Sequence, residues 1–442
     1  MASKSKIARQ GQVKQDKKVI FYLIAIPIVG FLIKLITMAN TPNGGWLGAD
    51  GENYLSGVDG LIAEGYFSEK SILSYWPAGY PILLWFLTKI SVANLLWIIS
   101  FSQSIFYAYA SYYFVKQLRD TKLRPYMFWI GMILAFNPTL SLSSMAVGYE
   151  SPIAACMLMV VGLIMKSKQS PNDRGLVIRV IGVGAFSALA SFMQPRWILT
   201  SIVVAVIWAL MYKSRKVQAL ILVGVIGVMA LAPATLIHRN IVSIDKPIIS
   251  TNISAALKIG TGPETSGGYK KTGPEIKCGG KSPGEQPTEG EFISCALRWY
   301  ASNPIKTVEL TWNKSIYFWS PWTGPNANGT MARNPWLKIN PIVDIGKNSQ
   351  DGNDLVYGTV GKMISWLWIV ANLFLLFYGF WKLKKMGGIH NNLSYLLMGP
   401  ILASWIAAVG TIGDHRFRIP TMSLSLVLQV IGFIAIKNKV LK

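Results

Sequence analysis

Long apolar runs recur along the 442-residue chain, separated by short polar turns and by two long polar segments at 39–78 and 238–362. A helix of about 20 apolar residues is long enough to cross the hydrocarbon core of a bilayer. The pattern therefore predicts an all-α polytopic membrane protein with about ten spans, plus an interfacial or re-entrant helix at 80–90. The ten predicted spans are 19–38, 92–115, 126–146, 151–165, 177–193, 197–212, 217–237, 363–381, 392–411 and 420–436.

The first apolar run, 19–38, follows a basic segment and so shares two features with a signal peptide. Its length, its weak cleavage pattern and the further apolar runs after it favour an uncleaved first helix instead. Under this interpretation the chain begins on the cytoplasmic side of the membrane.

Basic residues concentrate in every second turn between the predicted spans. With a cytoplasmic N-terminus, these inner segments together hold 23 of the 43 Lys and Arg residues, and the long segments 39–78 and 238–362 face outward with most of the carboxylates. Because Lys and Arg are enriched in cytoplasmic loops, we expect both chain ends inside and a location in the plasma (inner) membrane. The chain then divides into an N-terminal transmembrane module (1–237), an extracytoplasmic region (238–362) and a C-terminal transmembrane module (363–442).

The composition agrees with a membrane protein. Hydrophobic residues make up 52% and charged residues 14% of the chain, against roughly 25% charged in soluble globular proteins, so a soluble multi-domain enzyme is excluded. The net charge of +23 by itself could indicate a nucleic-acid-binding protein. A nucleic-acid interface needs a water-exposed basic face, however, whereas these charges flank apolar runs, so we expect no nucleic-acid partner.

Two cysteines lie in the long outer segment. Cys278 and Cys295 flank the second half of a polar stretch rich in Gly and Pro. An extracytoplasmic location permits a disulfide between them, and two free thiols are the alternative. Further along, 303–320 has the pattern of an amphipathic helix rich in aromatic residues, which would lie at the outer membrane surface in contact with lipids.

Ionisable and polar side chains gather in the turns that are predicted to face outward. They are Asp50, Glu52, Asp59, Glu150, Gln194, Arg196, His238, Arg239, Asp414, His415, Arg416 and Arg418. Some have ordinary structural explanations. Arg196 and Arg239 could extend toward lipid headgroups. Glu150 could stabilise the start of the next helix, and His415 could be a satisfied turn residue.

Several arginines together on the outer side change that interpretation. Positive charge is scarce there, so Arg239, Arg416 and Arg418 indicate an anionic partner such as a phosphate or pyrophosphate, which arginine binds in a bidentate fork. In the same group Asp50 could accept a proton from an attacking hydroxyl. The combination indicates a group-transfer reaction on a phosphate-containing substrate.

The outer motifs resemble those of GT-C glycosyltransferases, in the branch that includes protein mannosyltransferases and aminoarabinose transferases. The segments that carry the resemblance are 48–55, 76–81, 238–240, 249–252, 260–263, 296–321 and 415–420. They follow the order of the family and span most of the chain. The sequence departs from the family where Gly51 follows the first-loop acid, where Ile253 ends the Ser-Thr-Asn motif, and where Gln194-Pro195-Arg196 replaces an Arg-Pro pair.

The resemblance implies a GT-C fold and an enzyme that uses a polyprenyl-phosphate-linked sugar as donor. Asp50 corresponds to the catalytic acid of the first loop and would act as general base, with Glu150 as a second catalytic acid. The residues expected to bind the donor phosphate are Arg239, Arg416, Arg418 and His415. The residues expected to bind the substrates are Glu52, Tyr54, His238, Arg196 and Asn252. The acceptor could be a glycolipid, a glycan or a protein, and a divalent metal is left open.

Two other classes of protein share some of these features. A transporter or flippase for lipid-linked saccharides would also bind a lipid phosphate, but it is expected to place charges near the membrane midplane, often in two related halves. A scaffold with an outer binding domain could use the long segment 238–362. The charges at the outer ends of the predicted spans favour the glycosyltransferase. If the sugar is transferred in a single displacement, the anomeric configuration is inverted.

Overall fold

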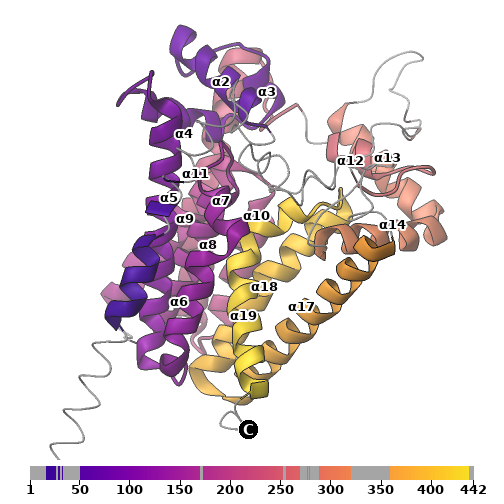
Figure 1. The fold of residues 1–442 in the computed structure, drawn as a ribbon. Helices are drawn as coiled ribbons and strands as arrows, with labels where there is room; N and C mark the ends of the chain where they lie inside the picture. Colours follow the sequence, from indigo (N-terminus) through magenta and orange to yellow (C-terminus); the bar gives the residue numbers. More distant parts are fainter. Residues whose placement is uncertain are drawn as a thin grey trace, which may run out of the picture.

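The computed structural model describes residues 16–25, 28, 29, 32, 50–169, 173–251, 255–268, 276, 278, 288–319 and 359–437. Within these residues every regular element is a helix. The helices form a bundle in which α2, α3, α12 and α13 lie at one end and the C-terminal end of α19 lies at the other (Figure 1). In chain order the elements are α2 (Gly51–Glu64), α3 (Ile72–Tyr75), α4 (Gly79–Thr88), α5 (Leu95–Gln117), η1 (Leu118–Asp120), η2 (Arg124–Tyr126), α6 (Met127–Phe136), α7 (Pro138–Ser143), α8 (Glu150–Gln169), α9 (Asp173–Met193), α10 (Trp197–Leu210), α11 (Arg215–Ile244), α12 (Ala255–Gly260), α13 (Glu289–Ser302), α14 (Pro304–Trp319), α17 (Thr359–Lys385), α18 (Gly388–Gly410), η4 (His415–Arg418) and α19 (Ile419–Lys437).

Six helices in the described part of the chain are long and apolar enough to cross a membrane. They are Glu150–Ser167, Arg174–Met193, Arg215–Ile244, Trp366–Lys385, Gly388–Gly410 and Arg416–Lys437. Each coincides with a span that the apolar pattern predicts. The chain is therefore a multi-pass membrane protein whose described elements are all helices, and the finer count of ten spans stays a prediction.

The structure differs from the predicted spans in two places. The predicted span 126–146 is interrupted, because α6 ends at Phe136 and α7 begins at Pro138. Asn137 between them has an extended backbone (ψ 119°), as expected for a residue that precedes proline. The predicted span 197–212 forms α10, whose 14 residues rise only about 21 Å and do not cross a bilayer alone. The predicted span 92–115 does form one continuous helix, α5 with 23 residues, although its Ser, Gln and Tyr side chains make it less apolar.

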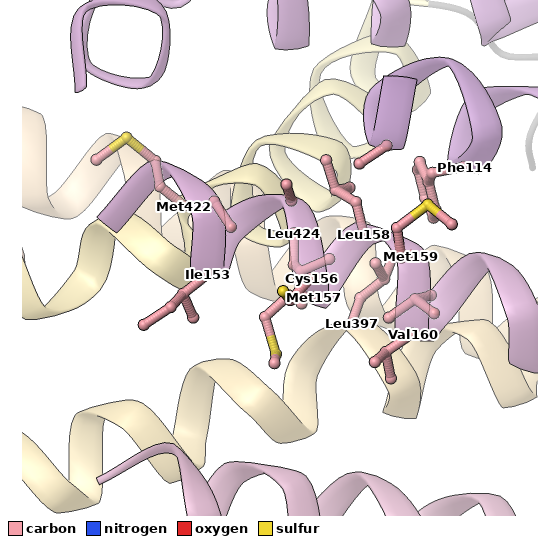
Figure 2. Close-up of a cluster of buried hydrophobic side chains, with 14 of the residues drawn as sticks. Phe114, Ile153, Cys156, Met157, Leu158, Met159, Val160, Leu397, Met422 and Leu424 are labelled. Atoms are coloured by element: carbon pink, nitrogen blue, oxygen red, sulfur yellow. The ribbon is translucent and has the colours of Figure 1, made fainter. Parts of the chain in front are cut away.

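Helix α8 lies in the middle of the bundle. Of its span, 89% is buried inside the protein, the largest share of the six. Figure 2 shows its side chains beside Phe114 of α5, Leu397 of α18, and Met422 and Leu424 of α19. A helix that is buried on all sides has no polar face that must turn toward solvent. Its rotation about its own axis is therefore set by side-chain packing against the neighbouring helices. The first residue of this central helix is Glu150, which is thereby held rigidly at the end of the bundle.

The C-terminal helices approach one another closely through glycine. A Cβ atom on Gly379 of α17 would lie 1.9 Å from the carbonyl oxygen of Leu428 in α19, and one on Gly432 would lie 2.3 Å from that of Leu375. Any larger residue at either position would push α17 and α19 apart. This packing sets the position of α19 and of η4, which immediately precedes it.

The region that the sequence predicts to face outward, 238–362, contains the two elements that the sequence suggests. Cys278 and Cys295 form a disulfide, with 6.0 Å between their Cα atoms, and so attach the preceding segment to α13. Helix α14 matches the predicted amphipathic segment. Its exposed apolar side chains Ile305, Val308 and Trp312 lie on one face, and the Trp312 ring is 6.0 Å from that of Trp366 in α17.

Candidate functional site

Three segments that are distant in the sequence meet at the end of the bundle where α8 begins. Asp50 precedes α2, Glu150 is the first residue of α8, and η4 contains Arg416. The local structure explains each position. The carboxylate of Glu150 suits the positive end of the α8 dipole. The Asp414 side chain accepts a hydrogen bond of 2.9 Å from the backbone N–H of Arg416 and so caps η4.

Arg416 joins the two carboxylates. Its Nη1 atom donates to Oδ2 of Asp50 at 2.5 Å, and its Nε atom donates to Oε1 of Glu150. The exposed fractions of the Arg416 and Glu150 side chains are 7% and 5%, and that of Asp50 is 17%. Such charge-assisted hydrogen bonds are strong when water is excluded. The guanidinium is therefore held in a fixed position, and of the three residues Asp50 is the most accessible from outside.

Tyrosine side chains form one wall of this site. The ring of Tyr54 is 5.0 Å from that of Tyr80 and 6.2 Å from that of Tyr149, both in edge-on contact. Burial, followed by the negative charges of neighbours that include Asp50, raises the pKa of Tyr54 well above its ordinary value. Tyr54 therefore stays a neutral hydroxyl that can donate a hydrogen bond at any physiological pH. The wall combines apolar surface with hydroxyl groups, which suits the faces and edges of a sugar ring.

Arg196 is the second arginine of the site. Its guanidinium stacks on Phe417 at 3.9 Å, and its Nη2 atom donates to the Tyr149 hydroxyl at 3.2 Å. Both partners are sequence neighbours of the central residues, Phe417 of Arg416 and Tyr149 of Glu150. The side chain is half-buried, so Arg196 is a positive charge at the border of the site that remains partly accessible.

Arg418 is buried and points toward α14. Its Nη1 atom donates to the carbonyl oxygen of Trp319 at 2.8 Å, and its guanidinium lies 5.8 Å from the Trp319 ring. Ser404 of α18 donates to the carbonyl oxygen of Phe417 at 2.9 Å. These bonds attach η4 to the end of α14 and to α18. Arg418 thus connects the turn to the amphipathic helix α14.

Arg239, expected to bind the donor phosphate, has a different environment. It is fully buried. Its Nε atom donates to the carbonyl oxygen of Tyr66 at 3.1 Å, Nη1 donates to that of Leu73 at 3.3 Å, and Nη2 donates to that of Ser68. A guanidinium has five N–H groups and can satisfy three carbonyls at once, here two in the loop between α2 and α3 and that of Leu73 in α3. In this structure Arg239 therefore supports the loop between α2 and α3, which is part of the predicted outer loop, instead of facing Arg416.

Replacement of Arg239 by glutamine should destabilise the outer loop. Three backbone carbonyls would lose their donor, at a cost of roughly 3 kcal/mol or more. We expect a lower thermal midpoint in detergent and faster amide exchange in residues 66–74. The matched control is Arg215→Gln, on the exposed first turn of the same helix. An Arg239→Gln variant with unchanged exchange and midpoint would contradict the supporting role.

The other candidates from the sequence lie at various distances from Arg416. His238 is beside Arg239, with its ring 5.9 Å from that of Phe67. Glu52 is exposed on the first turn of α2. His415 is the first residue of η4, but its side chain is outside the described part of the structure. Asn252 is also outside the described residues. The structure thus brings Asp50, Tyr54, Glu150, Arg196 and Arg416 into one site, with Arg418 at its border.

The motifs did not indicate every residue of the site. Tyr149, Tyr80 and Phe417 are absent from the predicted set, and the signal for two of them is their position next to Glu150 and Arg416. A divalent metal was left open by the sequence. In the described part of the chain no group of three or more His, Cys, Asp or Glu side chains gathers as metal ligands. The carboxylates of Asp50 and Glu150 share the Arg416 guanidinium, so we derive no step through a metal.

Comparison with known proteins gives similarity at the level of fold. No family model matches the sequence, and no curated protein matches it. The archaeal oligosaccharyltransferase AglB from Archaeoglobus fulgidus, in complex with an inhibitory peptide and a dolichol-phosphate, aligns with a TM-score of 0.47 at 13% identity, over 95% of this chain and 51% of that one. The Archaeoglobus fulgidus oligosaccharyltransferase tethered to an acceptor peptide aligns with a TM-score of 0.48 at 13% identity, over 95% and 50%. The chain spans about half the length of these proteins.

Proposed function

We propose that the protein is a membrane glycosyltransferase that moves a sugar from a polyprenyl-phosphate donor to an acceptor hydroxyl on the extracytoplasmic side. The observation that carries the proposal is the contact of Arg416 with both Asp50 and Glu150. These residues come from three of the outer turns that the distribution of basic residues predicts. An arginine held between two carboxylates, with aromatic walls beside it, supports a site for a phosphate and a sugar together.

The phosphate of the donor is the leaving group in this reaction. As the bond between the anomeric carbon and the phosphate oxygen breaks, negative charge grows on that oxygen. Asp50 and Glu150 occupy two N–H groups of Arg416, and a guanidinium has five. The remaining donors of Arg416, with the partly accessible Arg196, would stabilise this charge. Fixed donors are effective at this because they need no reorganisation during the reaction. Among the arginines proposed to bind the donor phosphate, Arg196 thus replaces Arg239 of the sequence-based prediction. Arg418, two residues after Arg416, adds a further positive charge.

Asp50 is the proposed general base. Its carboxylate is the more accessible of the two beside Arg416. It would accept the proton of the acceptor hydroxyl while the hydroxyl oxygen forms its bond to the anomeric carbon. The electron pair of the broken bond leaves with the polyprenyl phosphate, so one displacement inverts the anomeric configuration. Glu150 binds Nε of Arg416 and would keep the guanidinium oriented during this exchange.

A flippase for lipid-linked saccharides is the second class to separate from this proposal. The experiment uses purified protein with a radiolabelled polyprenyl-phosphate sugar in detergent micelles, and in parallel in liposomes with the donor on one leaflet. A transferase moves the label to an acceptor in both preparations. A flippase moves intact donor between leaflets in liposomes and leaves it unchanged in micelles, and that result would overturn the proposal.

A further inference from the structure

Lys314 is a fully buried cation outside the site described above. It lies on α14, and its side chain has no exposed surface. Its Nζ atom donates to the hydroxyl of Tyr300 in α13 at 2.8 Å and to the carbonyl oxygen of Val409, near the end of α18, at 3.0 Å. A buried charge is costly unless it is compensated by hydrogen bonds, so a lysine in this position needs a reason beyond packing.

Two outer loops lie directly against Lys314. A Cβ atom on Gly413 would be 2.5 Å from the Lys314 Cα atom, and one on Gly267 would be 2.8 Å from its Cγ atom. Only glycine allows this approach at both positions, and Gly267 also has a positive φ of 86°. The N–H of Gly413 donates to the carbonyl oxygen of Gly267 at 2.9 Å. Lys314 therefore lies beneath the point where the loop after α12 meets the turn after α18.

The hydrogen bonds continue from Lys314 into the loop after α12. The Tyr300 hydroxyl is 2.7 Å from Oγ1 of Thr261, and its ring lies 5.2 Å from the Lys314 ammonium. Among the described residues, Tyr300 is the titratable side chain that faces Lys314. The partner that Lys314 finds in α18 is the backbone carbonyl of Val409, and the loop after α12 and the turn after α18 approach it through Gly267 and Gly413, which have no titratable side chain.

The same turn leads from Lys314 to the candidate site. The chain passes from Val409 and Gly413, which contact Lys314, to Asp414, which caps η4, and then to Arg416, which binds Asp50 and Glu150. We propose that Lys314 is a positioning residue, which fixes the turn after α18 from below and thereby fixes the guanidinium of Arg416 relative to the two carboxylates. The inference uses the proposed transferase reaction for its main readout.

The protonation state of Lys314 decides how strongly it holds the turn. Burial lowers the pKa of the Lys314 ammonium to about 7, and burial raises the pKa of Tyr300, which stays a hydroxyl. The ammonium donates charge-assisted hydrogen bonds to both partners. Above neutral pH the amine is uncharged, and its bond to the Val409 carbonyl becomes an ordinary, weaker one.

The lowered pKa also sets the sign of the effect on stability. Between about pH 7 and 10, the unfolded chain keeps a proton that the folded protein releases, so the free energy of unfolding rises with pH in this window. Below pH 7 both states are protonated, and the folded protein bears the full cost of the buried charge. As pH rises above about 7, the free energy of unfolding therefore increases, whereas the hydrogen bond from Lys314 to the turn after α18 becomes weaker.

The test replaces Lys314 with methionine, which has similar length and no charge. We expect kcat for sugar transfer to fall about 10- to 100-fold with little change in KM for the donor, because the Arg416 turn is misplaced while the protein stays folded. Wild-type kcat should decline above about pH 7, whereas Lys314→Met should be uniformly low and Lys314→Arg, charged throughout, should not decline up to pH 9. Amide exchange in residues 409–418 should be faster in Lys314→Met. The thermal midpoint should also rise less between pH 7 and pH 9 in Lys314→Met than in the wild type.

The control is Lys306→Met, the same substitution at a partly exposed position of the same helix. If Lys314→Met does not fold, Tyr300→Phe removes one partner of the lysine without touching the turn, and it should lower kcat in the same direction. Wild-type kcat, pH profile and exchange in a folded Lys314→Met variant would overturn the inference. Wild-type protein that transfers no sugar under any condition would instead overturn the proposed function, and the exchange of residues 409–418 would still decide the positioning role.

Discussion

The Arg416→Gln variant is expected to lose sugar transfer by at least about 1,000-fold, the upper range for removal of one donor that stabilises a developing oxyanion. The reason is the double role of this guanidinium, which bonds to Asp50 and Glu150 and faces the proposed phosphate. Glutamine is uncharged and carries its two donor hydrogens on a single nitrogen, so it cannot replace the charge-assisted bonds that Nε and Nη1 of Arg416 make to two different carboxylates. Lysine at this position keeps the charge but loses the fork, so Arg416→Lys should be impaired almost as strongly.

The same substitution should destabilise the fold. Two largely buried carboxylates would lose their shared cation, and breaking such a buried pair costs about 3–5 kcal/mol. The measurements are transfer from a labelled polyprenyl-phosphate sugar and the thermal midpoint in detergent. Arg298→Gln on the exposed surface of α13 is the control and should match wild type in both. If Arg416→Gln kept a tenth or more of wild-type activity, the role of Arg416 would be wrong.

The Asp50→Asn variant should lose about 100- to 10,000-fold in kcat, the range for removal of a general base. Asparagine has nearly the same shape and can still accept a hydrogen bond from Arg416, so the site should stay assembled. It has no basic carboxylate to take the proton of the acceptor hydroxyl. Binding of polyprenyl phosphate should be retained or become tighter, because one negative charge beside the phosphate is gone.

The matched control for this variant is Asp59→Asn, at an exposed position of α2, the helix that Asp50 precedes. A variant of Asp50 with lost transfer and lost donor binding would point to a binding role for the carboxylate. A variant with full transfer would exclude Asp50 as the base. The separation of kcat from donor affinity is therefore the informative result.

The apolar runs were sufficient to predict the six helices that the structure shows as candidate spans, because a span needs a near-continuous apolar sequence. The break at Pro138 was also visible in the sequence, since the residue before proline avoids helical backbone. The length of α10 was not, because the predicted span 197–212 continues in the sequence with apolar residues after Leu210, where the helix ends.

The candidate site was predictable in its members more than in its contacts. Alternation of inner and outer turns is enough to place Asp50, Glu150 and Arg416 at the same end of the bundle. The same reasoning treats Arg196 and Arg239 alike, as arginines at outer helix ends. Only the packed structure shows that Arg239 turns toward the carbonyls of the loop between α2 and α3, whereas Arg196 stacks on Phe417 beside Arg416. The direction of a long side chain depends on tertiary neighbours that the sequence does not order in space.

The most direct test of the account is a single-turnover reaction in detergent, with purified protein in excess over a labelled polyprenyl-phosphate sugar and with an acceptor from the native membrane. The account predicts that free polyprenyl phosphate and glycosylated acceptor form in equal amounts and with inverted anomeric configuration in the wild type. It predicts that Asp50→Asn forms both at least about 100-fold more slowly, so that almost none appears in the time of a wild-type turnover, although that variant still binds the donor. Intact donor after incubation with wild-type protein, or equal product from wild type and Asp50→Asn, would contradict it.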